Sequence, residues 1–397
     1  MLHARRSLAA AALRNQGSPQ TRTYTAWRWT GTKGDTTPKA LSITADVTSA
    51  GAGRAHSAVV AEGRLFTWGE NKYGELGHDS QDKEEIAEVE LPDGVKAREV
   101  ACGGYHTAMI STEGDLYTWG WGGSFFSGAG ALGHGDKESH NRPMLVTAFL
   151  ELGEKIKQVS CGTQHTLVLS EKGNVYAFGQ GEFGRLGTGI SSDLPAPEEI
   201  EYFRLEDGFE KEVVKVVCGA MFSCALTKQG GVYLWGPNRD GQLGLGEESL
   251  GDMYAQEVFP RRLRLFDVEG VRIVDIACGD SHVVALADSG VIYCWGGRVW
   301  LEPHTVTVPS RYENGIKNLT QVAAGKKSCY ALTEEGHLYS WVLGKGVFKK
   351  KTDVLHQDEK EDSLTPQMVD LNTYFSGEKV RDLAAGPNNS VVALTGK

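Results

Sequence analysis

One unit recurs along the chain, and its clearest copy is residues 100–120, which read VACGGYHTAMISTEGDLYTWG. An alternating run at 106–110 is followed by a turn at Glu113–Gly114 and a second alternating run at 116–119. Two alternating runs joined by a glycine-containing turn are typical of a β-hairpin. We therefore predict a hairpin here and wherever the unit recurs, so the chain is first analysed as a repeat protein.

The glycine that leads the unit occurs seven times, at intervals of 46 to 61 residues. These glycines are Gly53, Gly103, Gly162, Gly219, Gly279, Gly325 and Gly386. An aromatic residue follows sixteen positions after five of them and fifteen after the first, namely Trp68, Trp119, Phe178, Trp235, Trp295 and Trp341. Because spacing is nearly constant inside the unit and variable between units, the insertions lie between hairpins. Stacked four-stranded blades with variable outer loops have this pattern.

The seventh unit is incomplete, because sixteen residues beyond Gly386 lies past Lys397. The stretch Tyr24–Gly31 has the pattern of the missing hairpin arm. We expect the C-terminal strands to pair with it, which removes exposed sheet edges. The predicted fold is all-β, a seven-bladed β-propeller closed by pairing of N- and C-terminal strands. Residues 24–397 are predicted to form this single propeller, with irregular loops at 121–130 and 343–366.

The repeated pattern Ala/Val-Cys-Gly-x-x-His-Thr, then Gly-x-Val/Leu-Tyr-x-Trp-Gly-x-Asn-x-x-Gly-x-Leu-Gly-x-Gly, resembles the regulator of chromosome condensation repeat family. The resemblance covers roughly residues 24–397 and is clearest in 102–135, 161–189 and 218–246. After Trp295 and Trp341 the Gly-x-Leu-Gly tail is degraded. The resemblance implies a seven-bladed propeller. It implies less about activity, because function resides in sites carried by a fold.

The N-terminal segment has an unusual charge pattern. The first 34 residues contain no acidic side chain, and the basic ones are Arg5, Arg6, Arg14, Arg22, Arg28 and Lys33. Together with Leu2, Leu8, Leu13 and the Ala9–Ala12 run, this is typical of an amphipathic organellar presequence. We predict that residues 1–23 are a mitochondrial presequence and that the protein resides in the mitochondrial matrix. The alternative is a disordered tail on a cytoplasmic or nuclear protein. The apolar run is too short for a membrane span.

The net charge restricts the partners. It is −10 for the whole chain, and removing residues 1–23 takes away four arginines and leaves −14. An acidic body argues against general DNA binding, which depends on neutralising phosphates. A local basic patch for RNA stays open. We expect a monomer with protein partners, among them a ribonucleoprotein or a small GTPase.

Cysteines and histidines recur at fixed places in the unit. Cys102, Cys161, Cys218 and Cys278 precede the leading glycine, and Ala324 and Ala385 take that place later. A position that accepts Cys or Ala favours a small buried side chain. His56, His106, His165 and His282 stand three residues after the glycine. Histidines in different blades lie too far apart to share one ion at about 2 Å. We predict a structural hydrogen bond at this position, blade packing for the recurrent tryptophans, and no metal or cofactor.

Two segments depart from the repeat and are candidate partner-binding sites. From aromatic residue to leucine the tail spans eight residues in three units but thirteen from Trp119 to Leu132. The insertion lies within 121–130 and carries Trp121, Phe125 and Phe126. Exposed aromatic residues often anchor partners, although both phenylalanines packing over a neighbouring blade is an even alternative. Segment 343–366 contains the basic run Lys349, Lys350 and Lys351, for which a solvated loop is the default interpretation.

No nucleophile–base pair or paired carboxylates stand out from the repeats, so the chain is not predicted to be an enzyme. We favour a non-catalytic mitochondrial scaffold for assembly or RNA handling: ribosome biogenesis, transcript processing or respiratory-complex maturation. The alternative implied by the resemblance is a guanine-nucleotide exchange factor for a small GTPase, with loop 121–130 as a wedge. An ultraviolet-B photoreceptor-like role ranks third, because the corresponding stretches, Gly103–Thr107 and Gly162–Thr166, lack the tryptophan that such a protein uses.

Overall fold

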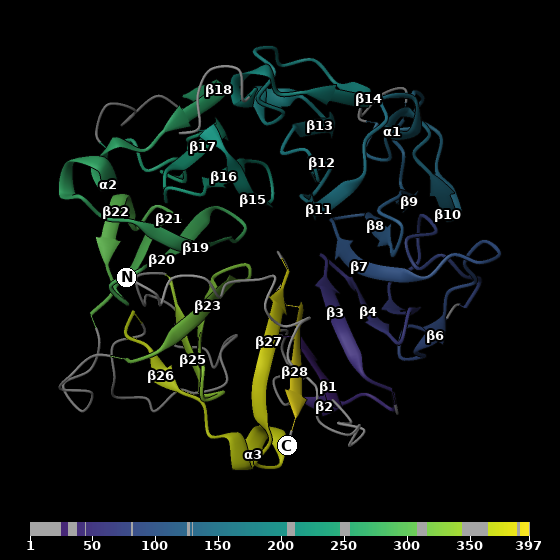
Figure 1. The fold of residues 1–397 in the computed structure, drawn as a ribbon. Coiled ribbons are helices and arrows are strands. Elements are labelled where there is room, and N and C mark those ends of the chain that lie inside the picture. Colours follow the sequence, from purple (N-terminus) through teal and green to yellow (C-terminus); the bar gives the residue numbers. More distant parts are fainter. Residues whose placement is uncertain are drawn as a thin grey trace.

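The computed structural model describes residues 25–30, 38–43, 45–80, 82–124, 128, 130–204, 211–246, 255–307, 316–343, 364–386 and 390–396. These residues form seven four-stranded antiparallel sheets, the blades, arranged in a ring (Figure 1). The first strand of each blade contacts the first strand of the next blade, and the last blade contacts the first in the same way. First strands are therefore innermost and fourth strands form the rim. The seven-bladed propeller predicted from the repeat is confirmed.

The first three blades are built from consecutive strands. Blade one contains β3 (Val47–Ala52), β4 (His56–Ala61), β5 (Arg64–Gly69) and β6 (Ala87–Glu88). Blade two contains β7 (Ala97–Cys102), β8 (His106–Ser111), β9 (Leu116–Gly120) and β10 (His140–Leu145). Blade three contains β11 (Ile156–Cys161), β12 (His165–Ser170), β13 (Val175–Gly179) and β14 (Leu194–Glu199). The short helices here are α1 (Ala148–Glu151), η1 (Glu182–Gly184) and η2 (Glu201–Phe203).

The next three blades repeat the arrangement. Blade four contains β15 (Val213–Cys218), β16 (Ser223–Thr227), β17 (Val232–Pro237) and β18 (Gln256–Arg262). Blade five contains β19 (Ile273–Cys278), β20 (His282–Ala287), β21 (Ile292–Gly296) and β22 (Trp300–Thr305). Blade six contains β23 (Leu319–Ala324), β24 (Ser328–Thr333), β25 (Leu338–Val342) and β26 (Gln367–Met368). Helix α2 (Arg264–Glu269) follows β18, and α3 (Leu371–Phe375) follows β26.

Blade seven joins the two ends of the sequence. Its order is β27 (Lys379–Ala385), β28 (Ser390–Gly396), β1 (Thr25–Thr30) and β2 (Lys39–Ala40). Strands β1 and β28 pair antiparallel over six residues, with Trp27 opposite Ala393. The Thr395 hydroxyl accepts a 2.9 Å bond from Trp27 Nε1 and donates to the Thr25 carbonyl at 3.1 Å. The predicted closure by N- and C-terminal strands is confirmed, and Figure 1 shows β1 beside β28.

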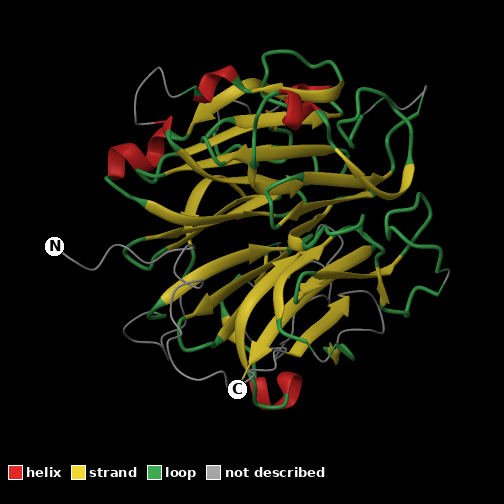
Figure 2. Cartoon of the chain, turned by 45° about the vertical axis from the view of Figure 1, so that its right-hand side comes forward, coloured by secondary structure: helices red, strands yellow, loops and turns green. Residues whose placement is uncertain are grey.

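The core lies between blades. Second strands such as β4, β8 and β12 are buried along their whole length. Figure 2 shows the blades as layers of strands with loops at their ends. One apolar cluster combines Ala58 and Val60 of blade one with Val100 and Trp119 of blade two. Trp119, Trp235, Trp295 and Trp341 are among the largest fully buried side chains. The predicted blade-packing role of the tryptophans is confirmed, and each blade is stabilised mainly by its neighbours.

The recurrent histidines also join neighbouring blades. His56 Nε2 lies 2.9 Å from Thr107 Oγ1, and His106 Nε2 lies 2.9 Å from Thr166 Oγ1. His165 and His282 make the same contact, at 3.1 Å to Ser223 Oγ and 3.4 Å to Cys329 Sγ. Burial lowers the pKa of His106 to about 3, so its ring is neutral at pH 7. The predicted structural hydrogen bond is confirmed.

A ring of polar side chains links the first strands. Its members stand four residues before each leading glycine, at a β-bulge: Ser49, Glu99, Gln158, Lys215, Asp275, Gln321 and Asp382. Gln158 Oε1 accepts from Val216 N–H at 2.9 Å, and its Nε2 donates to the Val216 carbonyl at 3.2 Å. Asp275 pairs with Lys215 at 2.6 Å and accepts from Val322 N–H at 2.8 Å. This polar ring adds directional bonds to the apolar blade contacts.

The seven cysteines are free. Of the four at the repeated position, Cys102, Cys218 and Cys278 are buried, as predicted. Cys161 is the partly exposed member. Burial raises the pKa of the Cys218 thiol to about 12, so it is protonated at neutral pH.

Over the described ranges, no helix is long and apolar enough to cross a membrane.

Candidate functional site

One end of the propeller is formed by two sets of loops. In every blade the loop from the first to the second strand, the inner loop, lies at the same end as the third-to-fourth connection, because neighbouring strands are antiparallel. The described inner-loop tips are 54–55, 104–105, 163–164, 220–221, 280–281 and 326–327. Backbone bonds join successive loops, such as Arg54 N–H to the Gly103 carbonyl at 3.1 Å. We call this end the loop face.

A glycine at the end of each third strand brings the outer connection against the inner loop. Gly120 has φ of 100°, and a Cβ there would lie 2.6 Å from the Tyr105 carbonyl oxygen. Glycine tolerates this conformation and close approach because it has no Cβ. The next residue, Trp121, then donates its backbone N–H to the same carbonyl at 2.9 Å. This local geometry places the start of insertion 121–130 on the inner loop of blade two.

Three aromatic rings meet at this point from three separate connections. Tyr73 and Tyr105 have ring centroids 5.6 Å apart in an edge-to-face arrangement. Trp121 lies 6.1 Å from Tyr105 and 6.3 Å from Tyr73. These spacings are those of favourable aromatic pairs. Trp121 is buried, at 8% exposure, while the two tyrosines keep partial exposure.

Two exposed cations border the aromatic rings. The Arg54 guanidinium carbon lies 5.1 Å from the Tyr105 ring centroid, and its Nη1 donates to the Tyr105 hydroxyl. Lys72 Nζ lies 4.9 Å from the Tyr73 centroid, and a hydrogen bond with Tyr73 raises the pKa of Lys72. Neither cation forms an ion pair with a carboxylate in the described part of the chain. Arg54, Lys72, Tyr73, Tyr105 and Trp121 form what we call the cation–aromatic cluster.

A buried carboxyl group, that of Glu75, fixes the loop that carries Tyr73. Glu75 is 3% exposed, and one of its oxygens accepts from the Tyr73 N–H at 2.6 Å. Burial raises the pKa of Glu75. Its backbone carbonyl accepts from Thr107 Oγ1 at 2.7 Å and from Trp119 Nε1 at 3.0 Å, both in blade two. The loop that presents Tyr73 is therefore fixed to the next blade, so the cluster is preorganised.

Further charges face the same end of the axis. Lys326 and Lys327 are exposed on the inner loop of blade six, and Asp280 is partly buried on that of blade five. Burial raises the pKa of Asp280, while the positive charges of Lys326, Arg54 and Lys327 oppose that rise. Side chains from blades one, five and six thus influence one another across the loop face. The arrangement suits binding of a partner and contains no acid–base pair set for catalysis among these residues.

The predicted site residues are placed as follows. Trp121 belongs to the cluster, but its ring is buried against Tyr73 and Tyr105 instead of exposed. Phe125, Phe126, Lys349, Lys350 and Lys351 lie outside the described residues, so these predictions stay predictions. The base of the insertion is described: Ser124 N–H bonds to the Gly128 carbonyl at 3.1 Å, and Gly130 packs against Pro195 of β14. The insertion therefore extends from blade two towards blade three.

Sequence reasoning missed four of the five cluster residues. Arg54 and Tyr105 occupy the two variable positions between the leading glycine and the histidine of the unit, and Lys72 and Tyr73 follow the third strand of blade one. Variable, polar or aromatic residues inside an otherwise constant repeat were the available signal. No group of three or more His, Cys, Asp or Glu side chains in the described ranges is arranged to hold a metal ion.

Comparison with known proteins identifies the family. A family profile described as "RCC1-like domain" matches residues 29–249, and one for the "Regulator of chromosome condensation (RCC1) repeat" matches residues 229–286. The chain belongs to the RCC1-like family. The human E3 ubiquitin-protein ligase HERC2 is 35% identical to this RCC1-like chain over 293 residues, which is 71% of the chain but 6% of HERC2. The Arabidopsis thaliana ultraviolet-B receptor UVR8 is 32% identical over 302 residues, 73% of this chain and 63% of UVR8.

Solved structures agree on the fold of this RCC1-like protein. The crystal structure of Kap60 bound to yeast RCC1 (Prp20) aligns with a TM-score of 0.76 at 21% identity, covering 95% of this chain and 90% of that one. A second structure of Prp20p from Saccharomyces cerevisiae aligns with a TM-score of 0.75 at 22% identity, covering 95% and 92%. At these identities the likeness establishes the architecture alone.

Proposed function

We propose that this RCC1-like chain is a non-catalytic protein-interaction scaffold that binds its partner through the loop face. The observation that carries the proposal is the cation–aromatic cluster, in which three packed rings stand beside two exposed cations without carboxylate partners among the described residues. Aromatic and arginine side chains commonly supply the anchors of protein interfaces. Prp20, which shares the fold, is described as bound to Kap60 and as binding Gsp1p and histones, and this supports a protein-binding role.

We further propose that the protein works in the mitochondrial matrix, in the assembly of ribosomes or respiratory complexes or in RNA handling. The support is the acid-free, arginine-rich start of the sequence and the resemblance to organellar members of the family. The test is the location of the full chain and of a variant without residues 1–23. We expect the full chain in the matrix and loss of import on deletion. A nuclear or cytosolic full-length protein would refute this part.

The scaffold proposal is tested by affinity capture from isolated mitochondria with the tag on a flexible C-terminal linker. Arg54→Glu reverses one cluster cation. Arg64→Glu is the matched control, because Arg64 also lies over an aromatic ring, Phe66, at 5.3 Å, but at the opposite end of blade one. We expect Arg54→Glu to lose specific partners that Arg64→Glu retains. Ribonuclease treatment of a parallel sample separates direct protein partners from those held through RNA.

The second candidate function is guanine-nucleotide exchange on a small GTPase. It is supported by the insertion, which starts at Trp121 in the cluster and extends towards blade three. We propose that the insertion acts as a wedge on the GTPase. A GTPase recovered in the capture is loaded with a fluorescent nucleotide, and nucleotide release is timed with wild type and with Phe125→Ala/Phe126→Ala. Faster release that the double variant loses supports exchange activity. Unchanged release for every recovered GTPase would leave the scaffold role alone.

Light sensing has the least support. The UVR8 match extends over the propeller, but the Gly-x-x-His-Thr stretches Gly103–Thr107 and Gly162–Thr166 carry no tryptophan. An ultraviolet-dependent change in oligomeric state, measured by light scattering, would restore this candidate.

A further inference from the structure

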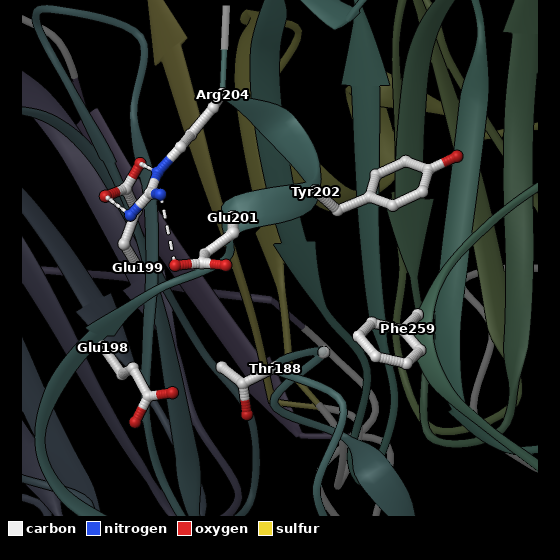
Figure 3. Close-up of a pocket in the computed structure, with 8 residues that line it drawn as sticks. Thr188, Glu198, Glu199, Glu201, Tyr202, Arg204 and Phe259 are labelled. Atoms are coloured by element: carbon white, nitrogen blue, oxygen red, sulfur yellow. Dashed lines mark hydrogen bonds and ion pairs between the residues drawn. The ribbon is translucent and has the colours of Figure 1, made fainter. Parts of the chain in front are cut away.

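A groove lies on the rim of the propeller between blades three and four, away from the cation–aromatic cluster (Figure 3). Its lining comes from the end of β14 and η2 on one side, from Phe259 of β18 on the other, and from Gly187 and Thr188 between them. Its volume is about 370 Å³, near the lower end of ligand-binding pockets. The groove can therefore receive one or two side chains of a partner.

The groove is negatively charged. Arg204 binds both Glu199 oxygens at 3.0 Å, and its remaining nitrogen lies 3.1 Å from Glu201. One arginine thus serves two carboxylates. The exposed Glu198 lines the same groove, and no partner for it is found among the described residues. Three carboxylates face two cations, the Arg204 guanidinium and the Lys211 ammonium, which leaves one negative charge that suits a cation from outside.

An exposed aromatic ring lies opposite these charges and is held in place. Phe259 is 55% exposed, and the blade-three loop packs on it at Gly189, where φ is 90° and a Cβ would overlap the ring. The Gly189 N–H also bonds to the Val258 carbonyl at 2.9 Å. Figure 3 shows Phe259 and Tyr202 on the side of the groove away from Glu198. The Phe259 ring is thus exposed and also fixed by its neighbours, so a partner does not have to order it.

Two details bear on what the groove can hold. The ammonium of Lys211 lies 4.4 Å from the Tyr202 ring centroid, so this ring already attracts a cation. Thr188 borders the groove, but its hydroxyl oxygen is buried and has no hydrogen-bond partner within the described residues. Because this oxygen is buried, a molecule in the groove does not reach it, and it adds nothing to binding.

We propose that this rim groove is a second protein-binding site, which takes an arginine or lysine side chain from an extended basic segment of a partner. The aliphatic part of the side chain packs on Phe259, and the cation pairs with Glu198. Long basic side chains combine an apolar stem with a charged end, which matches the apolar and acidic sides of the groove. The net charge of −10 favours approach of a basic segment. The site is separate from the loop face, so its test does not depend on the scaffold proposal.

The test measures binding of a fluorescein-labelled peptide, Gly-Ser-Arg-Leu-Arg-Ser, by fluorescence anisotropy at 150 mM salt. Its counterpart with glutamate in place of arginine measures dependence on charge. Glu198→Gln removes the unpaired carboxylate, and Phe259→Ser removes the apolar contact. Glu113→Gln is the charge control, because Glu113 is exposed in the turn between β8 and β9 of another blade. Thermal unfolding of each variant confirms that it is folded.

We expect the arginine peptide to bind at least tenfold more tightly than the glutamate peptide. We expect Glu198→Gln and Phe259→Ser each to weaken binding at least tenfold, about 1.4 kcal/mol, and Glu113→Gln to have no effect. Equal weakening by Glu113→Gln would overturn the proposal, because the acidic surface as a whole would then attract the peptide. Binding that survives both groove substitutions would overturn it too. If spermine binds more tightly than the peptide, the occupant of the groove is a polyamine, and the proposed basic segment of a protein partner is wrong.

Discussion

Glu99 offers a pH-dependent test of the polar ring, because its half-buried side chain lies between the first strands of blades two and three. Burial raises the pKa of Glu99 to about 7, against the effects of a hydrogen bond from Val159 N–H and of the Arg98 charge, which both lower it. In the next blade Gln158 occupies the same position and bonds to both backbone groups of Val216. Glu99→Gln should reproduce that pair of bonds without carrying a titratable group.

The expected loss of stability follows from the difference between the folded and unfolded pKa of Glu99. The ordinary pKa is 4.5 and the folded value about 7, so the folded state binds the proton more tightly than the unfolded state. Its contribution to stability is complete below pH 4.5 and is lost as the pH rises through about 7. At 1.36 kcal/mol per pKa unit the full loss is about 3 kcal/mol. Partial exposure of Glu99 reduces this loss through solvent screening, so we expect a loss of stability of about 1–3 kcal/mol.

The assay is urea unfolding of wild type and Glu99→Gln at pH 5, 6, 7 and 8. We expect the free energies of unfolding to be similar at pH 5, and the variant to be about 1–3 kcal/mol more stable than wild type at pH 8. Gln158→Glu is the reverse control, which should lose stability as the pH rises. Identical pH dependence of wild type and Glu99→Gln would refute the burial of a titrating carboxyl in the ring.

Three further predictions concern contacts between and within blades. His106→Ala should lower the free energy of unfolding by about 2–4 kcal/mol, because it removes a buried ring and its bond to Thr166. Burial lowers the pKa of His106 to about 3, so the stability that this neutral ring contributes above its ordinary pKa of 6.5 is lost as the pH falls towards 3. Acid titration followed by circular dichroism should therefore show a weaker pH dependence of stability in the variant. Gly120→Ala should cost at least about 2 kcal/mol in urea unfolding, because φ is 100° and the Tyr105 carbonyl occupies the space; a loss below about 0.5 kcal/mol would contradict this. Thr395→Val should lower the free energy of unfolding in urea by about 1–2 kcal/mol, because Trp27, Thr25 and Glu378 lose a hydrogen-bond partner in the closing blade. An unchanged free energy would show that these bonds do not secure closure.

The fold was largely predictable because one spacing repeats seven times. The sequence spacing from Gly103 to Trp119 is the length of one hairpin. The incomplete unit after Gly386 indicated that Tyr24–Gly31 closes the ring. The polar ring was missed, although its members stand at a constant position. The pattern of apolar residues was read within each unit. Glu99 and Gln158 occupy the same position only when the units are aligned with one another, so the shared polar position was not seen.

The candidate site was less predictable for a physical reason. Trp121 was identified because its loop is longer than the others. Arg54, Tyr73 and Tyr105 come from three different connections, and their proximity depends on how neighbouring blades are rotated. Local sequence patterns determine strands and turns, but they do not tell which loop tips meet across a blade boundary. The rim groove has the same origin, since Glu198 and Phe259 belong to different blades.

The most direct test of the scaffold account is hydrogen–deuterium exchange of the purified chain with and without the partner recovered by affinity capture. The account predicts that binding slows exchange in the loop-face segments 53–55, 72–74 and 103–105. The turns at the opposite end, 62–63, 113–114 and 172–173, should exchange at an unchanged rate. Protection of those turns with none on the loop face would contradict the account, because the partner would then bind the other end of the propeller.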